Sequence, residues 1–332
     1  MNKVHLLGLN STWVLKQEFI SLKRILIENN YSIKSSKFAY NSVVYLSSKY
    51  GLSKSFYHLF NNKVVFDYFH GNPNKDKMFL ESYNNLFKFS QRFHRIRVTH
   101  NEIFELLNKD QLFGKVYKIP LGISIKNFNE CDLEKKIFLR KKFNLPTDAF
   151  IIGSFQKDGS GWGQGFQPKK VKGPDILIDT LKILNKEIKN LFVLLLGPSR
   201  GYVTKNLKEN KIDFFHYQLS ENNYEKIVNF YNCLDAYLIT SRQEGGPKGL
   251  LESMACKIPV VSTNVGQAQD ILIDNKNGFK TNSFEAEELA DKMTYLYNNK
   301  DKVNIIVKNA RDTAKIHDYN NQINLWADFF NF

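Results

Sequence analysis

Two glutamates, Glu244 and Glu252, stand eight residues apart, on either side of a glycine pair and a proline. An apolar run typical of a buried strand precedes them. Pro247 suits the first turn of a helix, so Gly245 and Gly246 are expected to form the turn between strand and helix. The N-terminus of such a helix offers N–H groups and the positive end of its dipole to an anion. Two carboxylates around an anion site suit one extended ligand with a phosphate in its middle, which describes a nucleotide sugar.

The same spacing also fits an ordinary strand, turn and helix that carries two surface glutamates. Taken alone, the spacing favours this plainer interpretation, because a short motif has a high rate of chance matches. Other parts of the chain must decide between the two interpretations.

A second candidate segment is the glycine-rich stretch from Gln156 to Gly173, which follows an apolar run at Phe150–Phe155. Its five glycines do not satisfy G-x-G-x-x-G in any register, so the usual dinucleotide fingerprint is absent. Loops of this length are more often functional or disordered than inert. We expect a long, mobile loop whose basic end folds over a phosphate, and the alternative is a floppy surface insertion.

Short apolar runs alternate with helical patterns along most of the chain, which predicts an α/β fold with parallel sheets covered by helices on both faces. The expected strands are Val4–Leu9, Val64–Phe69, Val116–Ile119, Phe150–Phe155, Phe192–Gly197, Ala236–Thr240 and Pro259–Ser262. The expected helices include Val14–Glu28, Asp132–Lys142, Asp175–Glu187, Tyr224–Asn232 and Glu285–Tyr297.

The chain has 332 residues, more than one hydrophobic core usually serves, so we expect two doubly wound domains. The boundary is expected near Ile119–Gly122, where a proline and a glycine follow a strand. This gives an N-terminal domain of residues 1–122 and a C-terminal domain of residues 123–317. Ligands bind at the carboxyl ends of parallel strands, so two such domains facing each other would share a central cleft.

The formal net charge of +14 is unevenly distributed. Residues 1–122 hold 18 Lys and Arg against 8 Asp and Glu, and the remaining residues hold 29 against 25. A basic first domain suits an anionic partner such as a phosphorylated lipid, a membrane face or nucleic acid, although a composition typical of an AT-rich genome explains it equally well. Three scattered cysteines fit a reducing compartment, and no apolar stretch resembles a signal peptide or a membrane span, so a cytoplasmic protein is expected.

With these features in order, the chain resembles the family-4 retaining glycosyltransferases of the GT-B fold, a group that includes bacterial lipid and polysaccharide glycosyltransferases. Glu244 to Glu252 fits the family's E-x7-E motif. Further matches, in the family's order, are Val98–His100, Ile119–Ile123 with Phe128, Lys172–Asp175, Leu196–Pro198, Ile258–Thr263 and Val265–Gly266. So many ordered matches favour the functional interpretation of the two glutamates.

By this resemblance, Glu252 accepts hydrogen bonds from the donor's ribose hydroxyls, and Glu244 holds the sugar together with backbone N–H groups of the turn. A carboxylate suits a ribose because each hydroxyl needs an acceptor. Lys172 is similar to the family lysine that meets the diphosphate. The donor-binding set that the resemblance implies is Lys157, Lys172, Gly245, Gly246, Pro247, Lys248, Gly249, Leu250 and Glu252, with Leu219 in the segment 217–221 that selects the base.

His70 follows the expected strand Val64–Phe69 and resembles the family's cleft histidine, which touches the donor sugar near the reacting carbon. A lone histidine at a strand end is usually structural, but this position favours an active-site role, so His70 joins Glu244 as a catalytic candidate. Ser154 stands where the family often has a phosphate-binding arginine. The candidates to replace that arginine are Lys157, Lys169, Lys170 and Arg200. The family's glycine pair after the first strand is replaced by Gly8–Trp13, whose N–H groups are expected to face a phosphate or acceptor.

No two aspartates in the chain are two apart, so the metal-holding D-x-D motif of the other large glycosyltransferase fold is absent. This predicts a reaction that needs no metal ion. The resemblance implies that the reaction is transfer of a sugar from a UDP- or GDP-linked donor to an acceptor hydroxyl, without another cofactor. Lys172, other lysines and the helix near Pro247 would meet the charge on the departing diphosphate. The resemblance implies retention at the anomeric carbon, with a diphosphate oxygen taking the acceptor's proton and Glu244 orienting the sugar.

The resemblance also implies a saccharide or lipid-linked acceptor, in bacterial surface polysaccharide or glycolipid synthesis, and a last helix, about 318–332, that crosses back to the first domain. Residues 43–60 mix aromatics with lysines, as interfacial helices do, which suits peripheral contact with the anionic inner face of the plasma membrane; the alternative is that these aromatics belong to the core. One alternative is a GT-B epimerase or phosphorylase. Another is a basic membrane- or nucleic-acid-binding protein with a vestigial sugar site. Nucleic acid is not the expected partner, because the implied site residues are all present.

Overall fold

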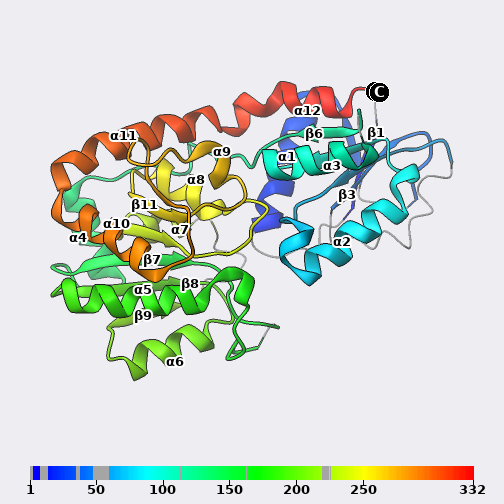
Figure 1. Ribbon diagram of the computed structural model, residues 1–332. Helices are drawn as coiled ribbons and strands as arrows, with labels where there is room; N and C mark the ends of the chain where they lie inside the picture. The colour runs from blue at the N-terminus through cyan, green and yellow to red at the C-terminus, as the bar shows by residue number, and fades with distance from the viewer. Residues whose placement is uncertain are drawn as a thin grey trace. The chain divides into compact units, whose positions relative to one another are not determined.

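The computed structural model describes residues 3–7, 14–34, 38–47, 60–112, 114–161, 163–218, 224 and 226–332. The chain divides into two compact units (Figure 1). Unit 1 comprises Met1–Gly122, Gln243–Gly246 and His317–Phe332, and unit 2 comprises Ile123–Arg242 and Pro247–Ile316. Within the described ranges each unit has a six-stranded parallel sheet, which confirms the expected α/β class with two doubly wound sheets.

The sheet of unit 1 has the strand order β2-β1-β3-β4-β5-β6. Its strands are β1 (Lys3–Leu7), β2 (Ser32–Lys34), β3 (Val43–Ser47), β4 (Lys63–Asp67), β5 (Arg95–Val98) and β6 (Val116–Lys118). Its helices are α1 (Val14–Glu28), α2 (Lys77–Lys88), α3 (Asn101–Leu107) and α12 (Ile323–Phe330).

The interpretation of residues 43–60 as an interfacial helix is wrong for the first part of the segment. Residues Val43–Ser47 form strand β3, which is buried along its whole length and pairs with β1 and β4. The aromatic and aliphatic side chains that suggested a membrane contact therefore fill the sheet's interior here. Residues 48–59 lie outside the described ranges, as does the Gly8–Trp13 segment.

A buried charged network joins helix α12 to the sheet of unit 1. The Arg97 side chain on β5 is 1% exposed and pairs with Asp67 at 3.3 Å and with Glu18 at 3.6 Å. Its Nε donates to the Ile119 carbonyl at 2.8 Å, and its guanidinium carbon lies 5.0 Å from the centre of the Trp326 ring. Buried charges are tolerated only when they are paired and hydrogen-bonded, and Arg97 meets both conditions.

The sheet of unit 2 has the strand order β12-β11-β10-β7-β8-β9. Its strands are β7 (Phe150–Phe155), β8 (Leu191–Leu196), β9 (Phe214–Tyr217), β10 (Ala236–Ile239), β11 (Val260–Thr263) and β12 (Phe279–Thr281). Its helices are α4 (Leu133–Lys142), α5 (Pro174–Glu187), α6 (Gly201–Glu209), α7 (Ile227–Tyr231), α8 (Lys248–Ala255), α9 (Ala268–Ile271), α10 (Ala286–Asn298) and α11 (Lys300–Ile316).

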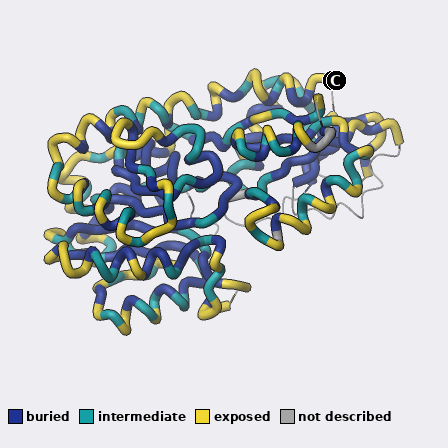
Figure 2. Tube along the Cα trace, in the orientation of Figure 1, coloured by how far each residue is buried: buried dark blue, intermediate teal, exposed yellow. Residues whose placement is uncertain are grey.

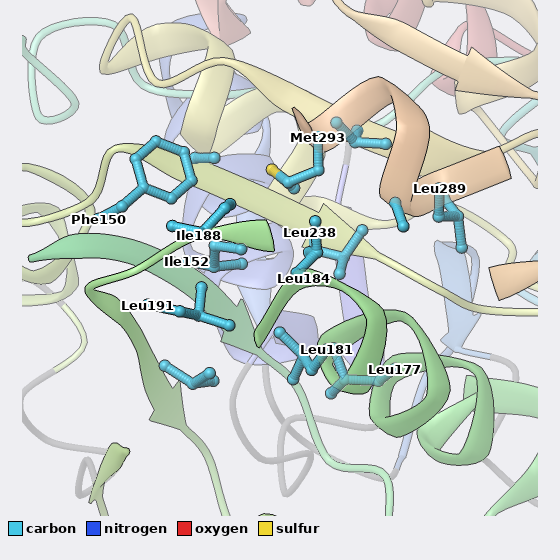
Figure 3. Close-up of a cluster of buried hydrophobic side chains, with 14 of the residues drawn as sticks. Phe150, Ile152, Leu177, Leu181, Leu184, Ile188, Leu191, Leu238, Leu289 and Met293 are labelled. Carbon is cyan, nitrogen blue, oxygen red and sulfur yellow. The ribbon is translucent and has the colours of Figure 1, made fainter. Parts of the chain in front are cut away.

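Helices α5 and α10 pack side by side on this sheet and form a hydrophobic core with it. Phe150 and Ile152 of β7 meet Leu177 and Leu181 of α5, with Met293 of α10 in the same cluster (Figure 3). The central strands β7, β8, β10 and β11 are largely buried, the edge strand β9 is partly exposed, and the outward helix faces are exposed (Figure 2). In the described part of the chain no helix is both long enough and apolar enough to cross a bilayer.

Candidate functional site

The strand order of unit 2 points to a ligand site at the carboxyl ends of β7 and β10. Counted within the unit, the order is that of a dinucleotide-binding sheet, and it reverses between these two neighbouring strands. In such sheets ligands bind beyond the carboxyl ends of the strands at the reversal. The segments that follow β7 and β10 are the glycine-rich stretch and the E-x7-E segment. The topology therefore brings the glycine-rich stretch and the unit 2 part of the E-x7-E segment, Pro247–Glu252, to one edge of the sheet.

The glycine-rich stretch is docked on the turn that follows β8, which argues against a floppy insertion. Gly159 and Gly165 lie so close to the Ser199 carbonyl that a Cβ on either would approach its oxygen to 2.2 Å. The Ser199 hydroxyl donates to the Gly163 carbonyl at 2.8 Å. The Lys169 N–H donates to the Asp158 carbonyl at 2.7 Å and closes the base of the loop. The glycines thus permit close backbone packing that no side chain would allow.

A buried ion pair lies beneath this loop. Asp158 and Arg200 have fully buried side chains, with 3.1 Å between Oδ2 and Nη2. Arg200 also donates to the carbonyls of Ser154 at 2.6 Å and Gln156 at 3.0 Å, and to the Ser154 hydroxyl at 3.2 Å. Burial raises the pKa of Asp158 and lowers that of Arg200, and the attraction between the two groups opposes both shifts.

Arg200 therefore lies beside Ser154, the position of the missing family arginine, but it serves the loop's own structure. Its Nη1 donors are shared among backbone carbonyls, including that of Leu196 at 3.2 Å, and the residue is 1% exposed. Arg200 was one of the four candidates to replace the arginine, but its side chain is already bonded to groups inside the protein. Lys157 and Lys169 are half-buried in the same loop and Lys170 is exposed.

The end of the loop turns sharply at Gly173 before α5 begins. Gly173 has φ +62°, and a Cβ there would lie 1.8 Å from the Thr240 carbonyl oxygen at the end of β10. The Thr240 hydroxyl donates to the Gly173 carbonyl at 2.9 Å. Only glycine fits such a left-handed position in contact with another backbone. This contact fixes the position of the neighbouring Lys172, whose side chain is half-buried.

Arg242 ties the same turn to the segment after β10. Its two Nη atoms donate to the two Asp175 oxygens at 2.8 and 2.9 Å, and its N–H donates to the Val171 carbonyl at 2.9 Å. Lys170 adds a further ion pair to Asp175 at 2.8 Å. Burial raises the pKa of the Asp175 carboxyl, but the hydrogen bonds from Arg242 and Lys170 outweigh it and hold that pKa well below its usual value.

Helix α8 carries Glu252 on its buried side. Pro247 is the N-cap residue, so the helix begins one residue later than the sequence suggested. Gly249 lets the first turn approach Tyr237, whose hydroxyl would lie 2.4 Å from a Cβ at that position. Glu252 is 3% exposed, and its Oε2 accepts a hydrogen bond from the Tyr231 hydroxyl at 2.7 Å. Its Oε1 accepts one from the Tyr224 hydroxyl.

The glutamate loop itself, Gln243–Gly246, belongs to unit 1 and packs on the segment that follows β4. The Asn72 N–H donates to the Gln243 Oε1 atom at 3.1 Å. The Thr99 hydroxyl, which follows β5, donates to the Gly245 carbonyl at 2.5 Å. The structure thus brings this loop against the carboxyl ends of β4 and β5, about 145 to 170 residues earlier in the chain.

His70 lies in the same place. Its ring stands edge-on to Tyr68, with 5.5 Å between ring centres, and 5.6 Å from the centre of the Phe79 ring. A Cβ on Gly245 would lie 3.4 Å from the His70 backbone nitrogen. Unit 1 therefore places the backbone of His70 next to the residue that follows Glu244. Glu244 is 8% exposed.

The predicted site residues divide between the two units. His70, Glu244, Gly245 and Gly246 belong to unit 1, and the unit 2 members are Lys157, Lys172, Pro247, Lys248, Gly249, Leu250 and Glu252. Lys248 is 6% exposed in the first turn of α8. Leu219 lies outside the described residues.

Sequence reasoning gave no role to the residues that hold this site together. Arg242 and Gln243 directly precede the E-x7-E motif, and Thr99 lies in the matched stretch Val98–His100, so the positions of these three residues could have drawn attention to them. Tyr231 carried no signal of its own, because an aromatic residue on an expected helix is usually part of the core.

Comparison with known proteins gives a family match for part of the chain. Residues 167–313 match the model described as "Glycosyl transferases group 1". The capsular polysaccharide biosynthesis glycosyltransferase CapM of Staphylococcus aureus is 24% identical over 219 residues, or 63% of this chain and 53% of CapM. The O-antigen biosynthesis glycosyltransferase WclY of Escherichia coli is 30% identical over 138 residues, or 41% of this chain and 35% of WclY. The chain thus spans about half or less of these curated relatives.

Solved structures match over almost the entire chain. Alr3699/HepE of Anabaena, solved in complex with UDP and glucose, has a TM-score of 0.76 at 16% identity. The match covers 99% of this chain and 98% of the HepE chain. Sucrose-phosphate synthase of Thermosynechococcus elongatus also has a TM-score of 0.76, at 14% identity and with 99% and 98% coverage. At these identities the likeness establishes a common fold, the two parallel sheets of the GT-B type.

Proposed function

Because this chain is related to the group 1 glycosyltransferases and has the GT-B fold, we propose that it moves a sugar from a nucleoside-diphosphate sugar to an acceptor hydroxyl. One observation carries the proposal. The Lys172–Gly173 turn contacts the end of β10 and helix α8 follows it, β10 is the neighbour of β7, and both segments fall within the residues 167–313 that match the family model. A crevice at this reversal of strand order is where such sheets hold nucleotides.

The donor's parts are assigned to residues by their chemistry. The N–H groups of Lys248 and Gly249 at the start of α8 suit the diphosphate, with Lys172 and Lys157, from the segment that follows β7, as cations. The buried Glu252 carboxylate suits the ribose hydroxyls, which donate hydrogen bonds. We assign Leu219 to the base. A UDP-linked donor is the first choice, since HepE was solved with UDP.

The sugar is assigned to the loop that packs on β4 and β5. Glu244, with the backbone of Gly245 and Gly246, would hold the sugar hydroxyls, and His70 would contact the sugar near the anomeric carbon. The acceptor hydroxyl attacks that carbon from the face that the diphosphate leaves. The bond from the anomeric carbon to the diphosphate oxygen breaks, the bond to the acceptor oxygen forms, and a diphosphate oxygen takes the acceptor's proton. The configuration is retained, and Glu244 orients the sugar without forming a covalent bond to it.

The positive groups of the crevice would carry the leaving diphosphate's charge, so we propose that no metal ion is required. The acceptor is proposed to be a saccharide or lipid-linked saccharide of a bacterial surface polysaccharide, because CapM and WclY serve capsule and O-antigen synthesis. The basic character of residues 1–122 suits work at the cytoplasmic face of an anionic membrane.

Calorimetric titration with UDP, GDP and their sugar conjugates, in the presence of a chelator, tests the donor site. One nucleotide should bind the intact protein and bind Glu252→Ala at least about tenfold more weakly, as expected for the loss of a charged hydrogen-bond acceptor. Glu287→Ala, at an exposed glutamate on α10, is the matched control and should bind normally. If no nucleotide binds, the proposal of a nucleotide-sugar site is wrong.

Product stereochemistry tests the mechanism separately. The anomeric configuration of the product, measured by NMR from the coupling constant of the anomeric proton, should equal that of the donor. An inverted product would exclude the same-face attack, and a rate that a chelator abolishes would exclude the metal-independent reaction.

A further inference from the structure

Glu252 is held from both sides by phenol hydroxyls. Tyr231, the last residue of α7, donates to Oε2 at 2.7 Å, and Tyr224 donates to Oε1. All three side chains are buried, with Tyr231 at 0%, Glu252 at 3% and Tyr224 at 7% exposure. A buried carboxylate is costly unless hydrogen bonds compensate it, so these two donors stabilise the charged form of Glu252 where it lies.

The Tyr231 ring is itself fixed by aromatic neighbours. Its centre lies 4.8 Å from that of Phe155 at the end of β7, 5.3 Å from that of Tyr237 on β10, and 6.2 Å from that of Phe128. Phe155 and Tyr237 belong to the two strands between which the strand order reverses. The hydroxyl is thus anchored to the sheet, and the direction in which it holds the Glu252 carboxylate is set by β7 and β10.

The Tyr231 hydroxyl keeps its proton at neutral pH. Burial, and next to it the negative charge of Glu252, raise the pKa of Tyr231 well above its usual value of 10.0. The phenol therefore acts as a donor and the carboxylate as an acceptor.

We propose that Tyr231 and Tyr224 are positioning residues that orient Glu252 to recognise the vicinal diol of a ribose, and so make the donor site select ribonucleotides over 2′-deoxyribonucleotides. This inference rests on the proposed function, because it needs Glu252 to face the ribose. Selection follows because a fixed, buried acceptor binds a ligand hydroxyl without reorganising. The same acceptor is left without that donor when the ligand lacks the hydroxyl.

The test is a comparison of two ligands in four proteins. UDP and 2′-deoxy-UDP are titrated calorimetrically into the intact chain, Tyr231→Phe, Tyr224→Phe and the control Tyr297→Phe. Tyr297 is a partly buried tyrosine of unit 2 that packs against Phe150 in the α5–α10 core. Each substitution removes one hydroxyl and keeps the ring.

The intact chain should bind UDP at least about tenfold more tightly than 2′-deoxy-UDP, the ratio of dissociation constants expected for one charged hydrogen bond. In Tyr231→Phe and in Tyr224→Phe this ratio should fall by about threefold or more, mainly because UDP binds more weakly. Tyr297→Phe should leave the ratio unchanged.

The ratio separates positioning from general damage. If a variant binds both ligands more weakly by the same factor, or leaves the ratio of their dissociation constants unchanged, the inference about the tyrosines is contradicted. The proposed donor site is not affected by that result. If the intact chain binds neither nucleotide, the proposed function fails and the role of the tyrosines fails with it. Thermal unfolding of each variant is measured first, and should Tyr231→Phe not fold, the ratio in Tyr224→Phe decides the question, since that hydroxyl meets the other carboxylate oxygen.

Discussion

Gly245 packs backbone to backbone against Phe69, and a Cβ on Gly245 would lie 2.6 Å from the Phe69 carbonyl oxygen. The two residues are far apart in the sequence, but unit 1 contains both. The contact has a functional consequence, because Glu244 precedes Gly245 and His70 follows Phe69. The spacing of the two catalytic candidates therefore depends on a site where only glycine fits.

Gly245→Ala is expected to displace the glutamate loop from the end of β4. Under the proposed function, kcat/KM for sugar transfer should fall about 100-fold, because misplacement of a positioning group by about 1 Å has effects of that size. The Kd for UDP, measured by calorimetry, should stay within about threefold, since the nucleotide is assigned to unit 2. Unchanged transfer in this variant would show that the close contact is not needed.

His70→Ala tests the assignment of the histidine. Loss of one group that stabilises the reacting centre costs about 10² to 10³ in kcat, so the variant should lose transfer while it still binds UDP. His94→Gln, at an exposed histidine of the same unit, is the matched control and should transfer sugar normally. Comparable kcat values in the two variants would remove His70 from the site.

Gly173→Ala should strongly destabilise unit 2. The position has φ +62°, and the new Cβ would meet the Thr240 carbonyl oxygen at 1.8 Å, so the strand end or the turn must move. We expect a loss of about 2 to 4 kcal/mol in the free energy of unfolding, measured with urea. Gly163→Ala, in the same loop but with no atom within 4 Å, should change it by less than about 0.5 kcal/mol. If the two variants lose the same free energy of unfolding, the close contact of Gly173 with Thr240 does not determine stability.

Arg97→Met should lower the free energy of unfolding much more than Arg24→Met, a substitution at an exposed arginine of the same unit. Removing the guanidinium leaves Asp67 buried without its cation and removes the bond to the Ile119 carbonyl, so about 3 to 5 kcal/mol of unfolding free energy should be lost. Arg24→Met breaks an ion pair with Glu28 whose side chains are each 47% exposed, and it should cost less than about 1 kcal/mol. Urea titrations of the two variants measure the difference, and similar midpoints would contradict the prediction.

The pH dependence of unit 1 should include a contribution from His94. His94 lies at the surface, but partial removal of its ring from water, followed by repulsion from Lys63, lowers the pKa of His94 below its usual value of 6.5. Its Nδ1 accepts the Val64 N–H at 3.1 Å. The unfolded chain therefore takes up a proton at a pH where the folded ring does not. The contribution of His94 to the stability of the folded state is fully present at pH values above 6.5. It is lost as the pH falls through 6.5 towards the pKa of the folded ring.

His94→Gln removes this titration but keeps a side-chain oxygen that can accept the Val64 N–H. Urea midpoints at about pH 7.5 and pH 5.5 should differ less in this variant than in the intact chain. If both proteins lose the same stability between these pH values, His94 is not a source of the dependence.

Much of the architecture could be predicted because it depends on local periodicity. Strand Phe150–Phe155 and helix Val14–Glu28 have the ranges that their apolar patterns indicated. Strand β5 was missed because Arg95 and Arg97 interrupt its apolar run, and only the fold supplies the buried partners that Arg97 needs. Strand β3 was misread because aromatic residues beside lysines suit a membrane surface as well as a sheet interior.

The sequence by itself determined the alternation of strands and helices and the chemistry of the E-x7-E segment, because both follow from residues close together in the chain. Tertiary structure alone decided that Gln243–Gly246 packs on the ends of β4 and β5. It also decided that the Arg200 side chain bonds to the backbone of the loop above it, and that Tyr231 reaches Glu252. The physical reason is that local pattern reports which face of an element is buried, whereas the partner across that face is chosen by packing and hydrogen bonding between segments far apart in sequence.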